Sequence, residues 1–386
     1  MLEPAIAIVA CGAITAAGRG LDALRSALRS NSSGLRPCAR FDHPRYQSNI
    51  VGLAPREGLS GEPDDPAYQL ANEALREACD QAHDVLAPIP SERIGLVLAT
   101  TKANIESLER HMEGHPCSEA GRRHLLAHLL AADLAAAHRA RGPVIAVSLA
   151  CSSGLSALAQ GARMIQRGDT EAVFVVGVDQ LSAFVTAGFS ALMAMDPAGC
   201  RPFDSERRGL TPGEAGAAMV LVRSTRAPRG SIQLSGWGSS NDANHQTGPS
   251  RDGSGLALAI RCALEMTGVS PGEIDYVNAH GTATNYNDAM ESKALHTVFG
   301  SACPPVSGSK GLLGHTLGAA GVVETILCVL AMQERLLPGT PRLRVAQEGF
   351  PSSLVHEPRA AERMQYVLKL NTGFGGTNGA IVLRNE

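Results

Sequence analysis

Short runs of β-branched residues alternate along this chain with segments whose apolar residues recur at helical spacing. In the first half, these patterns predict strands at Ala5–Val9, Gly95–Ala99, Val144–Leu149 and Ala172–Val178, and a helix over Gly154–Arg167. In the second half, the same criteria predict helices over Gly255–Gly268, Asp288–Phe299 and Gly318–Leu336. They also predict strands at Ile274–Asn278, Tyr366–Leu370 and Gly379–Leu383. Alternation of this kind favours an α/β layered protein.

A segment that carries Pro, Gly and charge divides the chain near its middle. This segment, Ser224–Gly230, predicts a boundary between two similarly built halves, residues 1–225 and 231–386. A second segment, Arg36–Pro66, is rich in Pro, Gly and Arg and is predicted to be irregular, lying over the surface or capping an entrance.

Composition fits a soluble globular enzyme with more than one small core. The 386 residues are 44% hydrophobic and 18% charged, and the net charge of −3 gives no overall attraction to nucleic acid or an anionic membrane. We expect no membrane insertion, because no apolar run reaches the roughly 18 residues that span a bilayer. Nine cysteines without metal-ligand spacing predict free thiols in a reducing cytoplasm, and no metal site.

The sequence VSLACSSGLSAL places Cys151 between a predicted strand and a predicted helix. A thiol at a helix start lies near the positive end of the helix dipole, which favours the nucleophilic thiolate. The small residues Ser152, Ser153 and Gly154 allow backbone and substrate to approach closely. The alternative is a buried structural cysteine at a strand end.

Two histidines and a lysine lie in glycine-containing turns at the ends of predicted elements. His280 follows the strand Ile274–Asn278, at the sheet edge where α/β proteins usually bind ligands, and the alternative is a histidine held in its loop by hydrogen bonds. Lys310 and His315 precede the helix Gly318–Leu336, in a turn that could instead hold a phosphate, although it lacks the P-loop pattern.

The last candidate is the turn LNTGFGGTNGAIVL between the final two predicted strands. Backbone N–H groups around Phe374 can serve as an oxyanion hole, and the alternative is a tight hairpin with a core phenylalanine. Together with Cys151, His280, His315 and Lys310, this turn predicts acyl transfer followed by carbanion chemistry.

Five segments in one order make the chain resemble the β-ketoacyl-acyl-carrier-protein synthases of the elongating Cys–His–His type. They are the Cys151 turn, Arg201–Leu221, His280–Ser292 (HGTATNYNDAMES), Gly308–Gly321 (GSKGLLGHTLGAAG) and Gly373–Asn378 (GFGGTN). The resemblance implies a thiolase-like fold, with two similar α/β halves in αβαβα layers. It also implies decarboxylating condensation of an acyl thioester with malonyl-acyl-carrier protein, without a cofactor beyond the phosphopantetheine that the substrate carries.

The resemblance implies a role for each matching residue. Cys151 would be acylated, while His280 and His315 would support malonyl decarboxylation and hold the thioester oxygen as negative charge develops. Lys310 would orient the second of these histidines and form a charged network with Glu291.

The glycine-rich turn and the His280 segment would contact the substrate. Phe374 would be a gate residue, and its backbone N–H with that of Cys151 would form the oxyanion hole. The implied substrate-binding positions are Thr282 and Thr284 at the phosphopantetheine arm, with Thr372, Gly373 and Gly375 in the turn.

Two positions depart from many fatty-acid enzymes of this type. Thr372 replaces the first Phe of their FGFGG sequence, and Thr100–Glu106 (TTKANIE) lacks the expected GxG-type turn. With the compact length, both departures resemble the ketosynthases of aryl-polyene clusters. They leave the acyl chain length and the pathway, fatty-acid or polyketide, open.

Other functions fit these motifs less well. A non-catalytic chain-length-factor subunit of a ketosynthase heterodimer would lack Cys151, and a thiolase would have a second cysteine in the C-terminal turn. An initiating Cys–His–Asn synthase would have Asn in place of His315. A phosphate- or nucleotide-binding module leaves the Cys–His–His–Lys set unexplained.

The resemblance predicts an acyl-carrier protein as partner, and a homodimer or a heterodimer with a chain-length-factor subunit. Because carrier proteins are acidic, we expect a basic rim at the mouth of the site. The candidate docking residues are Arg207, Arg208, Arg40 and Arg45, with the pair Arg122–Arg123.

Overall fold

A computed structural model describes residues 5–351 and 353–385 of the chain. Its strands form one mixed sheet in the order β11-β10-β14-β15-β9-β1-β8-β7-β5-β6, with β2 paired to β1. The N-terminal part supplies β1 (Ile6–Thr15), β2 (Gly18–Arg19), β5 (Ile94–Ala99), β6 (Val144–Val147), β7 (Ala172–Asp179) and β8 (Ala215–Arg223). The C-terminal part supplies β9 (Gln233–Asn241), β10 (Tyr276–Ala279), β11 (Val306–Gly308), β14 (Tyr366–Gly373) and β15 (Thr377–Arg384). Among the described strands, the two groups are joined where the start of β1 pairs with β9.

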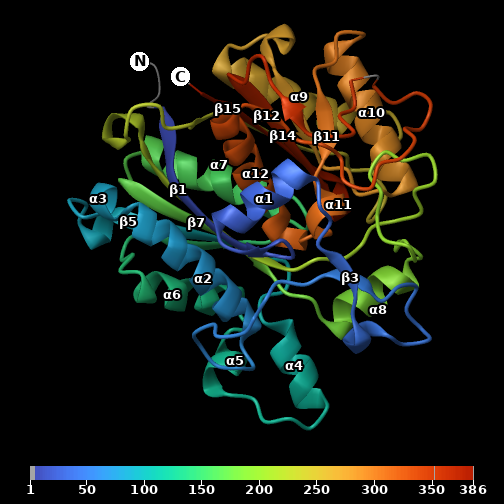
Figure 1. Cartoon of the computed structure of the whole chain (residues 1–386). Helices are drawn as coiled ribbons and strands as arrows, with labels where there is room; N and C mark the ends of the chain where they lie inside the picture. The colour runs from blue at the N-terminus through green and yellow to red at the C-terminus, as the bar shows by residue number, and fades with distance from the viewer. Residues whose placement is uncertain (1–4, 352, 386) are drawn as a thin grey trace.

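Helices form three layers around these two groups of strands (Figure 1). The N-terminal strands are covered on the outside by α2 (Pro66–Gln81) and α6 (Ala127–Ala137), and the C-terminal strands by α9 (Ser254–Thr267) and α10 (Asn285–Phe299). Between the groups lie α7 (Ser153–Gln166) and α12 (Ala320–Glu334), so the predicted αβαβα layering is confirmed.

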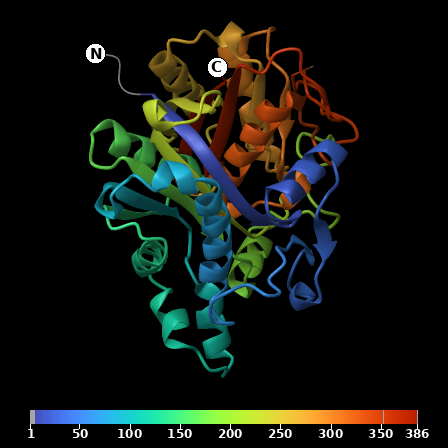
Figure 2. The ribbon, with the colours of Figure 1, turned by 60° about the vertical axis from the view of Figure 1, so that its left-hand side comes forward.

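Shorter elements complete the fold. Two of them, α4 and α5, project from the body, as Figures 1 and 2 both show. The helices are α1 (Leu21–Ser30), α3 (His83–Leu86), α4 (Ile105–Met112), α5 (Glu119–Arg123), α8 (Ala183–Ala191) and α11 (Lys310–Leu313), and the short strands are β3 (Leu35–Pro37), β4 (Ile50–Gly52), β12 (Leu336–Leu337) and β13 (Arg359–Ala360). The segment Arg36–Pro66 is therefore mostly irregular, apart from the β3–β4 pair.

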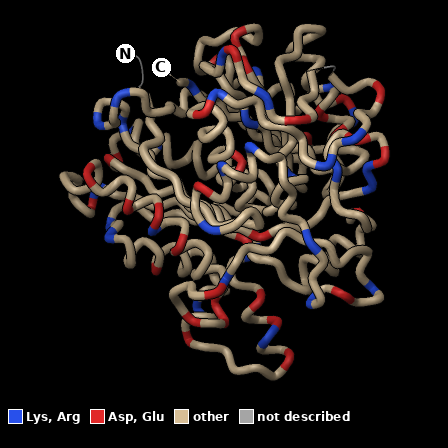
Figure 3. Tube along the Cα trace, in the orientation of Figure 1, with Lys and Arg blue, Asp and Glu red and all other residues tan. Residues whose placement is uncertain are grey.

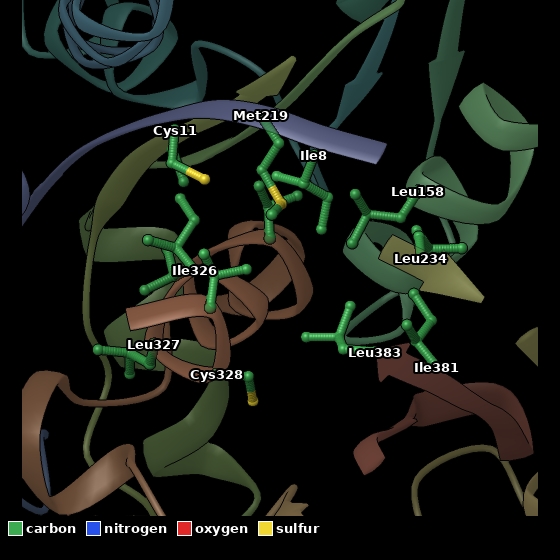
Figure 4. Packing of buried hydrophobic residues seen from close by; sticks show 14 of the residues in the cluster. Ile8, Cys11, Leu158, Met219, Leu234, Ile326, Leu327, Cys328, Ile381 and Leu383 are labelled. Carbon is green, nitrogen blue, oxygen red and sulfur yellow. The ribbon is translucent and has the colours of Figure 1, made fainter. Parts of the chain in front are cut away.

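The main hydrophobic core lies between the central helices and both groups of strands. Figure 4 shows side chains from β1, α7, β8, β9, α12 and β15 gathered there, among them Ile8, Leu158, Met219, Leu234, Ile326 and Leu383. Every α12 residue from Ala320 to Met332 is buried. Because it is buried along this length, α12 gives a fixed position to the turn that precedes it, which carries His315.

The expectation that the chain holds no membrane-length apolar segment was wrong. Leu317–Glu334 is long and apolar enough to cross a bilayer, but 89% of it is buried inside the protein. It also carries Glu324, whose carboxylate pairs with two buried lysines. The segment is the core helix of this fold, apolar because protein surrounds it on all sides.

Two central strands, β8 and β9, were missed by the sequence patterns. Both contain glycines that read as turn signals, yet these glycines lie under crossing helices. A Cβ on Gly216 would come 2.0 Å from the Leu70 carbonyl oxygen, and one on Gly238 would come 2.0 Å from that of Ala259. Glycine occupies these strand positions because the helix backbone approaches too closely to leave room for a Cβ.

A glycine pair sets the distance between the two central helices. A Cβ on Gly154 of α7 would come 2.7 Å from Gly321 Cα of α12, and one on Gly321 would come 2.4 Å from the Leu155 nitrogen. Both helices begin just after the turns that carry Cys151 and His315. The backbone contact therefore brings these two side chains together.

We expect Gly321→Ala to lower the free energy of unfolding by about 1–3 kcal/mol, because its methyl group has to push α7 and α12 apart. Urea unfolding measures this loss. Gly188→Ala, in helix α8 with open space around its Cβ position, is the matched control and should not destabilise the protein. Equal stability of Gly321→Ala and wild type would contradict the close contact.

Candidate active site

Cys151 lies in a sharp turn between β6 and α7. Ala150 has a positive φ of 47°, and Ser153 Oγ both accepts from the Leu149 N–H at 2.8 Å and donates to the Ala150 carbonyl at 2.6 Å. Such strained backbone is concentrated at functional sites. The turn directs the Cys151 side chain into a cavity of about 350 Å³.

His315 is hydrogen-bonded to the Cys151 sulfur. Its Nε2 lies 2.9 Å from Sγ, and its Nδ1 accepts from the Leu317 N–H at 3.3 Å. A backbone N–H can only donate, so Nδ1 is unprotonated and the proton of the neutral ring is on Nε2. His315 therefore presents an N–H to the sulfur.

His280 presents an N–H to the same cavity by a similar argument. Its Nδ1 lies 3.1 Å from Lys310 Nζ and 3.2 Å from Asn371 Nδ2, and both of these nitrogens are donors. The proton of the neutral His280 ring is therefore on Nε2. The two imidazoles lie 5.2 Å apart at 84°.

Both histidines are neutral in this environment. Burial lowers the pKa of His280 and of His315 well below the usual value, and the Lys310 ammonium lowers both further. The site thus holds two neutral N–H donors beside one sulfur.

The predicted Lys310–Glu291 network was wrong. Lys310 Nζ donates to the His280 carbonyl at 2.7 Å and to Glu324 Oε1 at 2.6 Å, so it orients the first histidine and has Glu324 as its carboxylate partner. Glu291 instead accepts from the backbone N–H groups of His280 and Gly281, at 2.6 and 2.7 Å. It holds the His280 turn in place.

The carboxyl of Glu291 has a pKa near neutral pH. Burial and the neighbouring Asp288 raise its pKa to about 7, against the hydrogen bonds from Gly281 and His280. It accepts hydrogen bonds from these two backbone N–H groups and from Asn287 Nδ2 at 2.9 Å, so its effect on the reaction acts through the position of the His280 turn.

Burial acts against the thiolate form of Cys151 that the start of a helix favours. Burial raises the pKa of its thiol to about 11, against the lowering effects of Lys310 and of the Phe374 N–H, which points at the sulfur. Desolvation thus outweighs the helix dipole.

The glycine-rich turn closes the cavity over Cys151. A Cβ on Gly373 would lie 2.7 Å from Thr377 Oγ1 and 3.1 Å from the Cys151 nitrogen, so a larger residue there would have to displace its neighbours. The Phe374 ring is 37% exposed and packs edge-on against Phe189 at 6.1 Å. Gly375 and Gly376 follow with φ of 82° and 75°. The gate and oxyanion roles stay predictions that this geometry allows.

Three of the implied substrate-binding residues line the cavity with their side chains. Thr282 Oγ1 lies 2.9 Å from Thr284 Oγ1, and Thr284 also caps α10. Thr372 donates to Asn287 Oδ1 at 2.6 Å. Gly373 is also part of the lining, whereas Gly375 donates its N–H to the Gln246 carbonyl outside it.

The triad atoms also have the spacing of a metal site. The ligand atoms of Cys151, His280 and His315 lie within 4.8 Å of one another. However, the Lys310 ammonium, 3.1 Å from His280 Nδ1, would repel a second cation at this position. The set fits acyl transfer better than metal binding.

Sequence comparisons agree with this geometry over most of the chain. Residues 3–227 match the beta-ketoacyl synthase N-terminal domain, and residues 232–344 match the beta-ketoacyl synthase C-terminal domain. The chain belongs to the β-ketoacyl synthase family. This assignment confirms the resemblance seen in the sequence.

Relatives of this synthase span both fatty-acid and polyketide enzymes. The 3-oxoacyl-[acyl-carrier-protein] synthase 2 of Vibrio cholerae is 32% identical, with full coverage of both chains. The actinorhodin polyketide putative beta-ketoacyl synthase 1 of Streptomyces coelicolor is 32% identical, covering 100% of this chain and 89% of its own length. The solved ketosynthase ApeO, in complex with its chain length factor ApeC from Xenorhabdus doucetiae, has a TM-score of 0.89 and 30% identity, covering 99% and 98% of the two chains.

The predicted docking arginines of the synthase differ in burial and in pairing. Arg207 is buried, forms an ion pair with Asp288 at 3.5 Å and donates to the Asp204 carbonyl, so its assignment as a docking residue was wrong. Arg208 is exposed and lines the cavity mouth. Arg40 pairs with Glu106 at 3.1 Å.

The remaining candidates stay predictions or are already paired. Arg45 is exposed, Arg122 donates to the Cys117 carbonyl, and Arg123 forms an ion pair with Asp133. Figure 3 shows positive and negative residues of the synthase interspersed along the trace. Arg208 is thus the docking candidate best placed at the mouth.

The segment that lacks the expected glycine turn has a structural role in the synthase. Ala103 takes a positive φ of 48°, and the residues before it hold the buried Asp179 carboxylate. Thr100 Oγ1 donates to it at 3.0 Å, and Lys102 Nζ forms an ion pair with it at 3.0 Å. Asp179 also accepts from the Gly318 N–H at 2.7 Å, in the turn after His315.

Sequence reasoning missed four buried polar residues around the triad. They are Asp179, Glu324, Lys369 and Asn371. Each lies within a strand, at a strand end or within a helix whose neighbours are apolar, so the pattern indicated core. The one available signal was the rarity of a charged residue within such a run.

Proposed function

We propose that this synthase condenses an acyl group, held as a thioester on Cys151, with malonyl-acyl-carrier protein. The observation that carries the proposal is the Cys151 sulfur lying 2.9 Å from His315 Nε2, with a second imidazole N–H from His280 facing the same cavity. A chain-length-factor role fits less well, because the nucleophile and both histidines are in place.

The first step transfers the acyl group. The Cys151 sulfur attacks the thioester carbonyl of the acyl-carrier protein, and the thiol proton passes to the departing phosphopantetheine sulfur. The oxygen that becomes negative lies near the N–H groups of Cys151 and Phe374. One such donor typically contributes about 3 kcal/mol of transition-state stabilisation.

The second step forms the new carbon–carbon bond. The malonyl C–C bond breaks and releases CO₂, and its electron pair forms an enolate whose oxygen accepts hydrogen bonds from Nε2–H of His280 and His315. The enolate carbon then attacks the acyl carbonyl on Cys151. The C–S bond breaks, the Cys151 sulfur leaves as a thiolate that takes a proton from water, and the β-ketoacyl thioester stays on the carrier protein.

Intact-mass measurement tests this function. The synthase is incubated with a panel of acyl-carrier-protein thioesters, and malonyl-acyl-carrier protein is then added. We expect a mass gain that malonyl-acyl-carrier protein discharges into a β-ketoacyl product two carbons longer. The best donor identifies the pathway, for which Thr372 and the Thr100–Glu106 segment favour aryl-polyene-type biosynthesis. Absence of any gain, even with a co-expressed chain-length-factor paralogue, would overturn the proposal.

We also propose that a second thiolase-fold subunit binds along β6 of this cytoplasmic enzyme. β6 is the last strand of the sheet, and Val144 and Leu149, at its start and just after its end, are 37% and 44% exposed. Exposed apolar edge strands pair readily with other chains. The solved relative ApeO has a chain length factor as its partner. Size-exclusion chromatography, alone and with the paralogue, decides between a homodimer and a heterodimer.

Arg208→Glu is expected to raise KM for the acyl-carrier protein about fivefold or more and to leave kcat nearly unchanged, because a rim charge acts on encounter. Steady-state kinetics at low and high salt measure this change. Arg229→Glu, at an exposed arginine just before β9, is the charge-matched control. An unchanged KM would remove Arg208 from the docking site.

A further inference from the structure

The lysines of this chain have an unusual distribution. Of its 34 basic residues, only four are lysine, and the rest are arginine. Lys293 is exposed, whereas Lys310 and Lys369 are buried beside the triad, and Lys102 is half-buried against the Asp179 carboxylate. The compact ammonium group is thus concentrated where a buried positive charge is needed.

Lys369 lies on β14, the strand that pairs with β10, and His280 follows the end of β10. Its side chain is fully buried, and its Nζ lies 2.7 Å from Glu324 Oε2. It also donates to the Leu370 carbonyl at 2.6 Å and to the Ala279 carbonyl at 3.3 Å. Ala279 immediately precedes His280.

These contacts require an ammonium group. Its neighbours are a carboxylate oxygen and backbone carbonyl oxygens, all acceptors, which match the three donors of a charged lysine. Burial lowers the pKa of Lys369, and Glu324 opposes this effect. The ammonium therefore shares one carboxylate with Lys310.

We propose that Lys369 is a positioning residue of the catalytic centre, which fixes the His280 turn and leaves the Lys310–Glu324–Lys369 cluster with one uncompensated positive charge beneath the histidines. The inference rests on the proposed condensation. In this role, the charge of Lys369 keeps the His280 ring neutral, so that its Nδ1 accepts a hydrogen bond from Lys310 Nζ.

The charge balance around His280 supports this role. Lys310, Lys369 and His315 face it, Glu324 neutralises one of the two lysines, and Glu291 is engaged by backbone N–H groups. Lys369 is one of the groups that lower the pKa of His280, after burial, Lys310 and His315. Besides Glu324, Lys310 and the two histidines, the ionisable groups that interact with Lys369 include the thiol of Cys328 and the carboxyl of Glu291.

The sign of the expected pH effect follows from this arrangement. Protonation of His280 at Nδ1 would replace an acceptor with a donor opposite the Lys310 ammonium and displace the ring. Removing the Lys369 charge makes that protonation easier, so the His280 pKa rises. As the pH is lowered, a variant without the Lys369 charge should therefore lose activity at a higher pH than wild type does.

The test compares Lys369→Met and Lys369→Gln with wild type. Methionine matches the lysine side chain up to Cε and lacks only the ammonium, and Glu324 keeps Lys310 as its partner. Glutamine removes the charge and keeps an amide donor for the carbonyls. We expect both to shift the acid limb of the rate of malonyl decarboxylation upward by about one pH unit. Lys293→Met, at the exposed lysine, should leave the profile unchanged.

A histidine-selective ¹⁵N NMR titration reads His280 without any substrate, with His280→Ala used to assign its signal. We expect the same upward shift in Lys369→Gln. Acid limbs and NMR titrations equal to wild type in both folded variants would overturn the inference, even if thermal stability had fallen. Wild type that condenses no donor would instead overturn the proposed function, and the NMR result would still decide the role of Lys369.

Discussion

Replacing Cys151 with alanine is expected to abolish the mass gain from acyl-carrier-protein thioesters and to lower condensation at least about a thousandfold. The sulfur is the atom that carries the acyl group, and no neighbouring side chain can replace it. His315 Nε2, 2.9 Å away, is left without its partner. Intact-mass spectrometry and product formation measure the two effects separately.

Cys11→Ala is the matched control for this variant. Cys11 is also buried, and burial raises the pKa of its thiol to about 12, but it lies in β1 within the hydrophobic core. This variant should be acylated like wild type. Retained acylation in Cys151→Ala would place the nucleophile at another cysteine and contradict the mechanism.

His280→Ala is expected to separate the two half-reactions. Condensation should fall about 100- to 1000-fold, because one of two N–H donors to the enolate oxygen is lost. Acylation of Cys151 should stay within about tenfold of wild type, since His315, rather than His280, is hydrogen-bonded to the sulfur. Single-turnover acylation and malonyl decarboxylation measure each step.

His296→Ala, near the end of α10, is the control for a histidine change outside the site. It should leave both steps unchanged. If His280→Ala lowered acylation as much as decarboxylation, the histidine would be holding the whole turn together, and the assignment of a separate role in the second step would be wrong.

Much of the fold was predictable because its strands and helices follow simple periods. The β5 and β7 strands and the central helices appear as apolar runs of the right length. Boundaries moved where capping decided them: α10 begins at Asn285 because Thr284 caps it, and α12 ends before Arg335, which has a φ of 50°. β8 and β9 were missed because their glycines serve packing between layers.

The sequence by itself singled out Cys151, His280, His315 and Lys310 as candidates. Each lies in a turn with glycines or other small residues at the end of an element, and the chain order of the turns is that of a known family. The sequence could not determine their partners. Lys310 pairs with Glu324 rather than Glu291, and Lys369 joins the same carboxylate from another strand.

Only the tertiary structure decided these pairings, and the physical reason is the same in each case. Helical or strand periodicity shows that a side chain is buried, but not which element faces it. Whether a buried carboxylate meets a lysine or a backbone N–H depends on how α12, β10 and β14 pack. That packing rests on contacts as small as the one between Gly154 and Gly321, which no local pattern encodes.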